Sequence, residues 1–544
     1  MSRTPQPPVR LSQVISLLVG AGALAIVLYA VVVVAAGEFH ADFTDTLLWA
    51  EASWHSGRLF DPMFHYAATL PFGGQWLMLP FLPLFGVGMA AHTAGMVLFT
   101  LLLAAAVVLL ARRSLGFSPL WTALALAFAL LSVSGSEKMR ELYWGHIIYY
   151  SLGSLFLTVG LTLATTVLRR HTADKPRLGG PDHRRTWFLS GAFCCWVFLC
   201  SVNGLQGMFT FGVPLLGALA LDWFFSPAPR GSAEKLAHQR VLTAAALCCL
   251  IGLAAGLLLT RRIPTWYTDY YASLSAPDQW MEHLLKLPRD WLTLLGYTPA
   301  PNTPIGSPAG LGNLFLLPGA VVLAVAPLVL FGIRGKIREP GIRLLVYAHV
   351  SMAAALVFAY VFGNISNVNW RLSPLVFTAA LCAAALVRIW FRDPKTRRFA
   401  ALVLLPVVLY GLAATAQIVT TPPNARESNR FYQLGQFLED AGLERGYATF
   451  WNASPVTFQT DAKVRIAPIV MENGIPKPYR YQSHRSWYEP AAGQTQWFLL
   501  LDENEYRTYS TLSADKLALA DRQLDAPDGY RVLVYSENCI DPDA

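Results

Sequence analysis

The sequence contains little charge. Asp, Glu, Lys and Arg make up 14% of its 544 residues, whereas hydrophobic residues make up 54%. A chain of this length would otherwise suggest several soluble domains, but so few charged side chains cannot cover their surfaces. The net charge is +8, yet no Lys/Arg-rich block with interleaved aromatic residues is present, so nucleic acid is not an expected partner. The composition instead predicts a protein with many membrane-spanning helices.

Cysteine is also scarce, with seven residues in the whole chain. Six of them fall inside apolar runs and Cys539 stands alone in the tail, so no disulfide framework is expected. The sequence shows no Cys–His spacing typical of a metal site, and no internal repeat or low-complexity tract. These absences exclude a disulfide-rich secreted fold, a zinc-finger module and a repeat array.

Long apolar runs are abundant. The first, Val14–Ala36, has 23 residues with Ser16 as its only polar side chain. At ~1.5 Å per residue it crosses a hydrocarbon core, and it is too long for a cleaved signal peptide. The runs predict a multispanning α-helical membrane protein with about eleven transmembrane helices, at 14–36, 91–111, 117–133, 147–168, 187–203, 207–225, 241–260, 313–333, 343–362, 373–390 and 399–418.

Basic residues are distributed unequally between the predicted loops. If the N-terminus is cytoplasmic, the inside segments carry 22 Lys and Arg residues and the outside loops of the membrane part carry eight. Basic residues concentrate on the cytoplasmic side of membrane proteins. We therefore expect the N-terminus inside and, after an odd number of spans, the C-terminal tail outside.

Two outside loops are long, at 37–90 and 261–312, and loops of this length usually carry function or short helices of their own. Asp278–Gly296 has the spacing of a helix that lies along the interface. The composition becomes polar near residue 424, which predicts a transmembrane domain over 1–423 and a small soluble α/β domain over 424–544. The patterns in this second domain predict one helix and four strands, at Glu427–Ala441, Tyr447–Trp451, Val464–Val470, Trp497–Leu501 and Tyr530–Tyr535.

Two aspartates stand in the first outside loop, in the segment His40-Ala-Asp-Phe-Thr-Asp45. Carboxylates at this position can perform acid–base or metal chemistry on a lipid-borne substrate without being buried in lipid. A short helix ended by Gly57 is predicted to follow. Two interpretations stay open: Asp42 caps this helix with Asp45 in its first turn, or one carboxylate deprotonates an acceptor hydroxyl or holds a metal.

The first span, the Asp-bearing outside loop and the short helix ending in Gly and Pro resemble the C-type membrane glycosyltransferases. These multispanning enzymes take a sugar from a polyprenyl-phosphate carrier, and the similarity is nearest to the bacterial mannosyltransferase and aminoarabinose-transferase-like branch. The resemblance covers the whole architecture and implies Asp42 as the catalytic base with Asp45 as its supporting acid. Phe43 follows Asp42 where relatives commonly have a second acid, so which aspartate matches the family's base stays open.

An arginine stands alone in a late outside loop, in Asn364-Ile-Ser-Asn-Val-Asn-Trp-Arg371. The segment is similar to one that precedes a late span in the same enzymes, which implies that Arg371 binds the lipid phosphate, a role that the planar guanidinium fork suits. Arg261 and Arg262, at the outer end of another span, oppose the positive-inside trend and are further candidates for phosphate binding. The alternative for all three is contact with lipid headgroups.

Glu141 and His146 belong to the next short outside loop, Ser136-Glu-Lys-Met-Arg-Glu-Leu-Tyr-Trp-Gly-His146. They are candidates for holding the acceptor or a divalent cation, Mg²⁺ or Mn²⁺, beside the aspartates, because hard cations favour carboxylate oxygens. The alternative is that Lys138 and Arg140 pair with the acids in a solvated loop.

The residues and the resemblance together predict an inverting glycosyltransferase in a bacterial inner membrane, with its active site outside. It would move a hexose or pentose from a polyprenyl-phosphate carrier to a glycan, lipid or protein acceptor, by a single in-line displacement. The alternative is a non-enzymatic flippase or transporter of lipid-linked saccharide, or a cell-envelope scaffold; the spans carry few of the ionisable residues that an ion-coupled carrier needs. Three tail tryptophans are candidates for stacking on sugar or for core packing, namely Trp451, Trp487 and Trp497.

Overall fold

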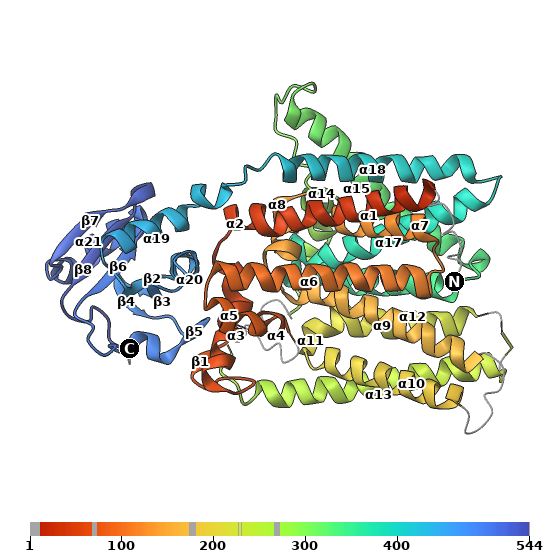
Figure 1. Cartoon of the computed structure of the whole chain (residues 1–544), viewed down its shortest axis with the longest axis horizontal. Helices are drawn as coiled ribbons and strands as arrows, with labels where there is room; N and C mark the ends of the chain where they lie inside the picture. The colour runs from red at the N-terminus through yellow and green to blue at the C-terminus, as the bar shows by residue number, and fades with distance from the viewer. Residues whose placement is uncertain are drawn as a thin grey trace, which may run out of the picture.

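A bundle of long helices carries a small sheet domain at one end (Figure 1). The computed structural model describes residues 11–67, 73–172, 181–226, 228–229, 231–265 and 273–542. Basic residues of the predicted inside segments that precede Leu11, or that lie at 173–180, fall outside the described residues. The chain therefore combines a membrane-type bundle with a C-terminal α/β unit, as the composition predicts.

Nine helices in the described part of the chain are long and apolar enough to cross a membrane. A helix pairs most of its backbone N–H and C=O groups within the segment, which a span in lipid requires. They are Leu11–Gly37 (α1, η1 and α2), Met89–Ser114 (α6 and η4), Tyr149–His171 (most of α9), Gly204–Phe225 (α11, η6 and α12), Ala233–Thr260 (α13), Pro308–Gly332 (α15), Pro340–Phe362 (α16), Asn369–Arg392 (η11 and α17) and Arg397–Val419 (α18).

The two remaining predicted spans also fall on helices, but of a different kind. Pro119–Ser132 (α7) is followed, after a bend of 115°, by the short arm Glu137–Gly145 (α8 and η5). Pro181–Ser201 (α10) packs against α9 and α13 but is not one of the nine helices that are long and apolar enough to span a membrane. The eleven predicted spans thus compare with nine such helices in the described residues, or ten if the bent pair is one span, and α10 is the predicted span outside this set.

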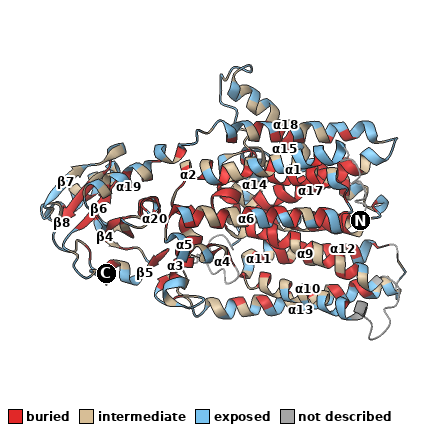
Figure 2. Ribbon diagram, in the orientation of Figure 1, coloured by how far each residue is buried: buried red, intermediate tan, exposed pale blue. Residues whose placement is uncertain are grey.

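Helix α17 (Ser373–Arg392) is the centre of the bundle. It is surrounded by α7, α9, α15, α16 and α18, and 94% of its apolar window is buried (Figure 2). Small residues such as Ala379 and Ala383 allow the neighbouring backbones to approach closely, which is how helices associate in lipid. α17 therefore fixes the position of the outer loop that precedes it, Asn364–Leu372.

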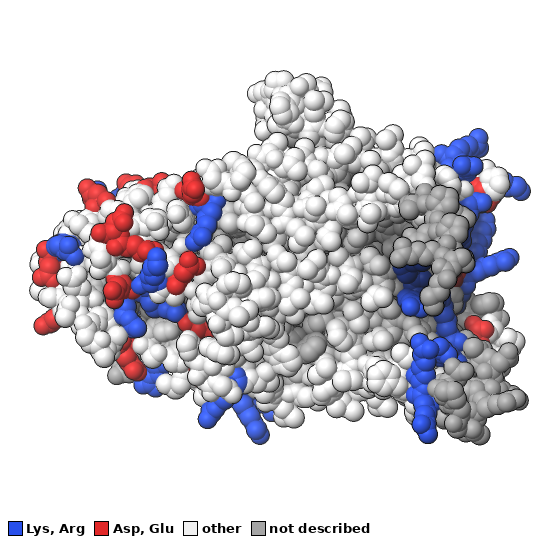
Figure 3. Space-filling view, viewed as in Figure 1, with Lys and Arg blue, Asp and Glu red and all other residues white. Residues whose placement is uncertain are grey.

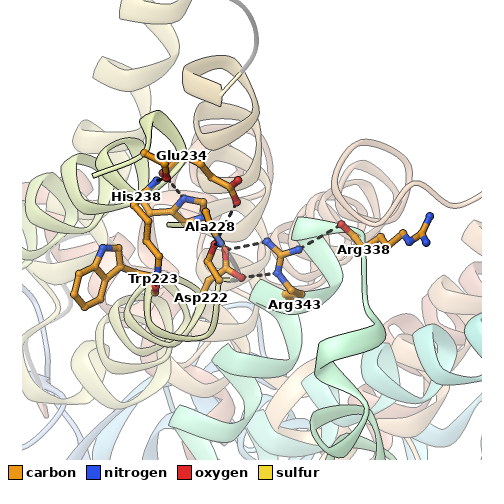
Figure 4. Close-up of polar contacts among 10 residues, drawn as sticks. Asp222, Trp223, Ala228, Glu234, His238, Arg338 and Arg343 are labelled. Atoms are coloured by element: carbon orange, nitrogen blue, oxygen red, sulfur yellow. Dashed lines mark hydrogen bonds and ion pairs between the residues drawn. The ribbon is translucent and has the colours of Figure 1, made fainter. Parts of the chain in front are cut away.

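Lys and Arg side chains gather at the end of the bundle opposite the C-terminal domain (Figure 3). A buried cluster at that end joins three helices (Figure 4). Asp222 of α12 accepts hydrogen bonds from Arg343 Nε at 2.7 Å and pairs with His238 Nε2 at 2.8 Å. His238 belongs to α13 and Arg343 to α16, so one carboxylate connects α12, α13 and α16.

The C-terminal domain contains a six-stranded mixed sheet of order β4-β3-β2-β6-β8-β7. β2 is parallel to β3 and β6, and the other pairs are antiparallel. The predicted helix is α19 (Arg430–Asp440), and each predicted strand overlaps an observed one. The strands are β2 (Arg445–Thr449), β3 (Arg465–Glu472), β4 (Ile475–Pro478), β6 (Trp497–Leu501), β7 (Arg522–Asp525) and β8 (Arg531–Tyr535).

The C-terminal domain docks on the first outside loop. Asn429 Nδ2 donates to the carbonyls of Gly37 and Phe39, both at 2.9 Å, where α2 ends. Asp461 Oδ1 accepts from Met89 N at the start of α6. β5 (Ser483–His484) also pairs with β1 (Phe64–His65). The first loop is therefore held between the bundle and the sheet.

Candidate active site

A cavity of about 550 Å³ lies where the bundle meets the C-terminal domain. Its walls come from α3 (Asp45–Ser56), the turn before α9, η6 (Met208–Gly212), α16, the loop before α17 and the tail. Of the residues that the sequence singled out, three line it: Asp45, His146 and Arg371. Segments far apart in the chain thus bring an acid, an imidazole and a guanidinium to one cavity.

Asp45 is the first residue of α3, and Thr46 and Trp49 line the cavity beside it. The Oδ1 atom of Asp45 is buried and has no hydrogen-bond partner among the described residues. Burial first, and then the negative charge of Asp42, raise the pKa of the Asp45 carboxyl well above its ordinary value. A buried carboxylate with a raised pKa facing a cavity suits a group that accepts a proton.

Asp42 lies in the 3₁₀ turn before α3, η2 (Ala41–Thr44). The interpretation of Asp42 as a helix cap is wrong: the cap residue of α3 is Thr44, whose side chain makes no cap bond. The turn places Asp42 inside a helical stretch, and its own N–H donates to His40 Nδ1 at 3.4 Å. Asp42 is half-buried and is not among the residues lining the cavity.

His146 connects Asp42 to the cavity. Its Nδ1 lies 2.8 Å from the Asp42 carbonyl, so Nδ1 carries the proton and donates. Burial lowers the pKa of His146, which keeps the ring neutral at neutral pH. Its Nε2 is then an acceptor, and it is buried without a hydrogen-bond partner in the part of the chain described. His146 and Asp45 therefore each bring a buried acceptor atom without a partner among the described residues to the same cavity.

The three predicted arginines differ in whether they line the cavity. Arg371, in η11 (Asn369–Leu372), is half-buried and lines the cavity. Arg261 and Arg262 are exposed where α13 ends and are not among the lining residues. Their position at the end of a span does not bring their side chains to the cavity, because α13 lies at the side of the bundle (Figure 1). Arg371 is the candidate with access to a ligand in this cavity.

Glu141 belongs to a neighbouring cluster. One ligand atom each of His40, Asp42 and Glu141 lie within 4.8 Å of one another, and His40 Nε2 is 3.5 Å from Glu141 Oε2. Lys138 forms an ion pair with the same carboxylate, which was the alternative that the sequence left open. One imidazole and two carboxylates are a donor set that Mn²⁺, Zn²⁺ or Mg²⁺ accepts.

A close contact fixes the backbone between the two parts of the site. A Cβ added to Gly145 would lie 2.3 Å from the ring of Phe43, and that ring stands between Asp42 and Asp45 in the sequence. Phe43 also packs on His40 and His146, with ring centroids at 4.6 and 5.8 Å. Glycine at 145 is therefore needed for the turn to approach the aspartate-bearing segment.

The tail contributes residues to the cavity that sequence reasoning missed. Tyr481 lines the cavity, and the charges of Asp45 and Asp42 are among the causes, after burial, that raise the pKa of its hydroxyl. Gln482 accepts a hydrogen bond from Trp49 Nε1 at 2.7 Å. The polar, aromatic run from Tyr479 to Gln482 between strands was the available signal, but nothing in its spacing places it beside the first loop.

Two solved structures with a similar fold hold a lipid phosphate. One is ArnT from Cupriavidus metallidurans bound to undecaprenyl phosphate, with a TM-score of 0.50, 13% identity and coverage of 97% of this chain and 99% of that one. Another is the oligosaccharyltransferase AglB from Archaeoglobus fulgidus in complex with an inhibitory peptide and a dolichol-phosphate, with a TM-score of 0.50, 11% identity and coverage of 96% and 74%.

No family model matches the sequence, and no curated protein matches it. The likeness to ArnT and AglB nevertheless extends over nearly the whole chain. The resemblance to the C-type glycosyltransferases is thus confirmed at the level of the fold, and the chain is a multispanning membrane protein with that fold.

Proposed function

We propose that this chain transfers a sugar from a polyprenyl-phosphate carrier to an acceptor hydroxyl in the cavity. The observation that carries the proposal is the convergence of Asp45, His146 and Arg371 on one cavity. An acid, an acceptor imidazole and a guanidinium are the groups that a phosphate-activated sugar and a hydroxyl nucleophile need. The fold shared with ArnT and AglB supports the same reading.

In the proposed reaction, Asp45 removes the proton of the acceptor hydroxyl as its oxygen attacks the anomeric carbon. The bond from that carbon to the phosphate oxygen breaks, and the polyprenyl phosphate leaves with the electron pair. Arg371 offsets the charge that develops on the phosphate. One in-line displacement inverts the anomeric centre, since no enzyme nucleophile intervenes. Asp42, the base implied by the family resemblance, is the alternative.

The orientation follows from charge. The basic end of the bundle (Figure 3) would face the cytoplasm and the C-terminal domain the outside. The cavity would then open toward the outer leaflet, and in bacteria the protein would reside in the inner membrane. Arg261 and Arg262, exposed at the end of α13, would contact lipid headgroups. The acceptor would be a glycan, a lipid or a protein outside the membrane.

A divalent cation is part of the proposal because the donor set at His40, Asp42 and Glu141 fits one. These three side chains would hold it, and a cation bound there would supply positive charge as a Lewis acid. Lys138 forms an ion pair with the Glu141 carboxylate, so metal binding would displace this lysine from it. Equilibrium dialysis with Mn²⁺ tests the site directly, and Glu141→Gln should abolish the binding.

The decisive experiment measures transfer of radiolabelled sugar from polyprenyl-phosphate donors bearing a hexose or a pentose. Purified wild type is compared with Asp45→Asn, Asp42→Asn and the control Asp515→Asn, which lies in the short α22 of the tail (Ala514–Leu517). We expect Asp45→Asn to lose at least about 10²-fold in rate, the lower range for a general base, and Asp515→Asn to lose nothing.

The outcomes separate the hypotheses. Full activity in Asp45→Asn with loss in Asp42→Asn would move the base to Asp42. Full activity in both variants would remove the aspartates from catalysis. Movement of the intact lipid-linked sugar across vesicles, without transfer from any donor, would instead favour the flippase alternative.

A further inference from the structure

A second cavity, of about 280 Å³, lies against another face of helix α3. Its walls come from α3, the loop after it and the sheet domain, so it forms only where the first outside loop and the C-terminal domain meet. It shares no lining residue with the first cavity. The residues that line it are Leu48, Glu51, Ala52, His55, Asp61, Phe64, Arg445, Arg465, His484, Ser486 and Trp487.

Helical periodicity explains why α3 serves both cavities. Asp45 and Trp49 are four residues apart and share one face, which lines the first cavity. Leu48, Ala52 and His55 repeat at the same three-to-four spacing on another face, which lines the second. The tail follows the same division, with Tyr481 in the first cavity and Trp487 in the second. The two cavities therefore lie against neighbouring faces of the same helix.

Most of the charged groups of the second cavity are paired with one another. Arg465 holds Glu51 with two hydrogen bonds, at 2.6 and 3.1 Å. His484 Nε2 lies 3.3 Å from Asp61 Oδ2. Arg445 lines the cavity at the start of β2, is exposed, and has no ion-pair partner among the described residues. The wall thus alternates hydrogen-bond donors with acceptors and has little excess charge of either sign.

Aromatic rings complete the wall. Trp487 is half-buried and meets Phe64 edge-on, with ring centroids 6.2 Å apart. The guanidinium of Arg465 lies 5.0 Å from the Trp487 ring and orients it. Of the three tail tryptophans considered as sugar platforms, Trp497 is buried in the core and Trp451 is exposed outside both cavities. Trp487 is the one that belongs to a cavity.

We propose that the second cavity binds a neutral sugar unit of an extended carbohydrate acceptor. This inference rests on the proposed glycosyl transfer at the first cavity. A sugar ring carries hydroxyls that both donate and accept, which matches alternating carboxylates and cationic donors. It also has an apolar face suited to an indole ring. An anionic ligand would meet the Glu51 and Asp61 carboxylates, which repel it.

The test is direct binding to the purified full-length protein. Mannotetraose, arabinotetraose, maltotetraose and chitotetraose are titrated separately and followed by saturation-transfer NMR, with inorganic phosphate as the anionic probe. We expect at least one tetrasaccharide to bind saturably. Arg445→Ser should weaken it about tenfold or more, the loss expected for one charge-assisted hydrogen bond. His55→Trp, which fills the cavity from an exposed position, should abolish it.

The control is Arg507→Ser, a comparable exposed arginine on α21 (Glu503–Leu512), which should leave binding unchanged. The proposal is overturned if no tetrasaccharide binds saturably. It is also overturned if Arg445→Ser and His55→Trp both bind as tightly as wild type. Phosphate binding that depends on Arg445 overturns the sugar class.

Transfer is measured on the same preparations, so that the two proposals fail separately. Asp45→Asn should lose transfer and keep tetrasaccharide binding. Wild-type transfer without binding at the second cavity refutes only the sugar subsite. Binding without transfer from any donor refutes only the proposed reaction.

Discussion

Arg465 of β3 donates two hydrogen bonds to Glu51 of α3, from Nη2 to Oε1 at 2.6 Å and from Nη1 to Oε2 at 3.1 Å. The pair joins the sheet domain to the helix that carries Asp45. Its Glu51 side chain is 7% exposed and its Arg465 side chain 18%, so solvent screens it little. The orientation of the candidate base thus depends on contact with a domain more than 400 residues away in the sequence.

Arg465→Ala should loosen the docking of the C-terminal domain. Removing Arg465 leaves the buried Glu51 carboxylate with only His55 beside it, at a cost of about 3 kcal/mol. We expect a lower melting temperature in detergent and faster trypsin cleavage between bundle and tail. Arg507→Ala, which breaks an exposed pair with Glu503, is the matched control and should change neither. Identical proteolysis in Arg465→Ala and wild type would contradict this role.

The same pair predicts a loss of stability in acid. Burial alone would raise the pKa of Glu51, but Arg465 and His55 together outweigh it and lower that pKa from 4.5 to about 2. A folded-state pKa below the unfolded value stabilises the fold above pH 4.5, and this stabilisation, about 3 kcal/mol, disappears as the pH falls toward 2. Between these pH values the melting temperature of Glu51→Gln should fall less steeply than that of wild type. If the melting temperatures of Glu51→Gln and wild type fall equally steeply with pH, Glu51 is not a source of the acid sensitivity.

The buried cluster around Asp222 lies at the end of the bundle opposite the C-terminal domain, and it allows a prediction about stability (Figure 4). Asp222→Ala leaves Arg343 and His238 without their shared carboxylate, in a position where Asp222 itself is fully buried. We expect a loss of about 3–5 kcal/mol, the range for breaking a buried charge cluster. Asp222→Asn should lose less because an amide oxygen still accepts one hydrogen bond. Thermal unfolding of both variants checks this order, and an unchanged Asp222→Ala protein would refute it.

The spans and the strand β6 could be predicted from sequence because their signal is local. Trp497–Leu501 is a short continuous apolar run, and every residue of it is buried. The edge strand β7 was missed because Arg522–Asp525 is mostly exposed and carries no apolar pattern. The sequence predicts a simple span at 117–133, because hydropathy does not reveal the 115° bend that follows α7.

The residue types of the candidate site could be predicted from the sequence, but not which side chains line the cavity. Asp42 and Asp45 are equivalent in the sequence, and only the 3₁₀ turn before α3 places Asp45 on the cavity wall and Asp42 beside His40. The same limit applies to Tyr481 and to the Gln482–Trp49 hydrogen bond, since both depend on how the tail packs on the first loop. Long-range packing decides orientation, and one sequence carries little information about it.

Arg371 provides the sharpest test of donor binding. If its guanidinium holds the lipid phosphate, Arg371→Ala should raise the KM for the polyprenyl-phosphate donor by about 10- to 100-fold, the range for one lost charge-assisted hydrogen bond. The maximal rate should fall as well, because charge on the phosphate grows as it leaves. Arg371→Lys should keep part of the affinity, since it retains the charge but loses the planar fork. Arg261→Ala and Arg262→Ala are matched controls: both side chains are exposed at the end of α13 and away from the cavity, so the KM should stay within about twofold of wild type. A larger effect in either control than in Arg371→Ala would place the donor phosphate outside this cavity.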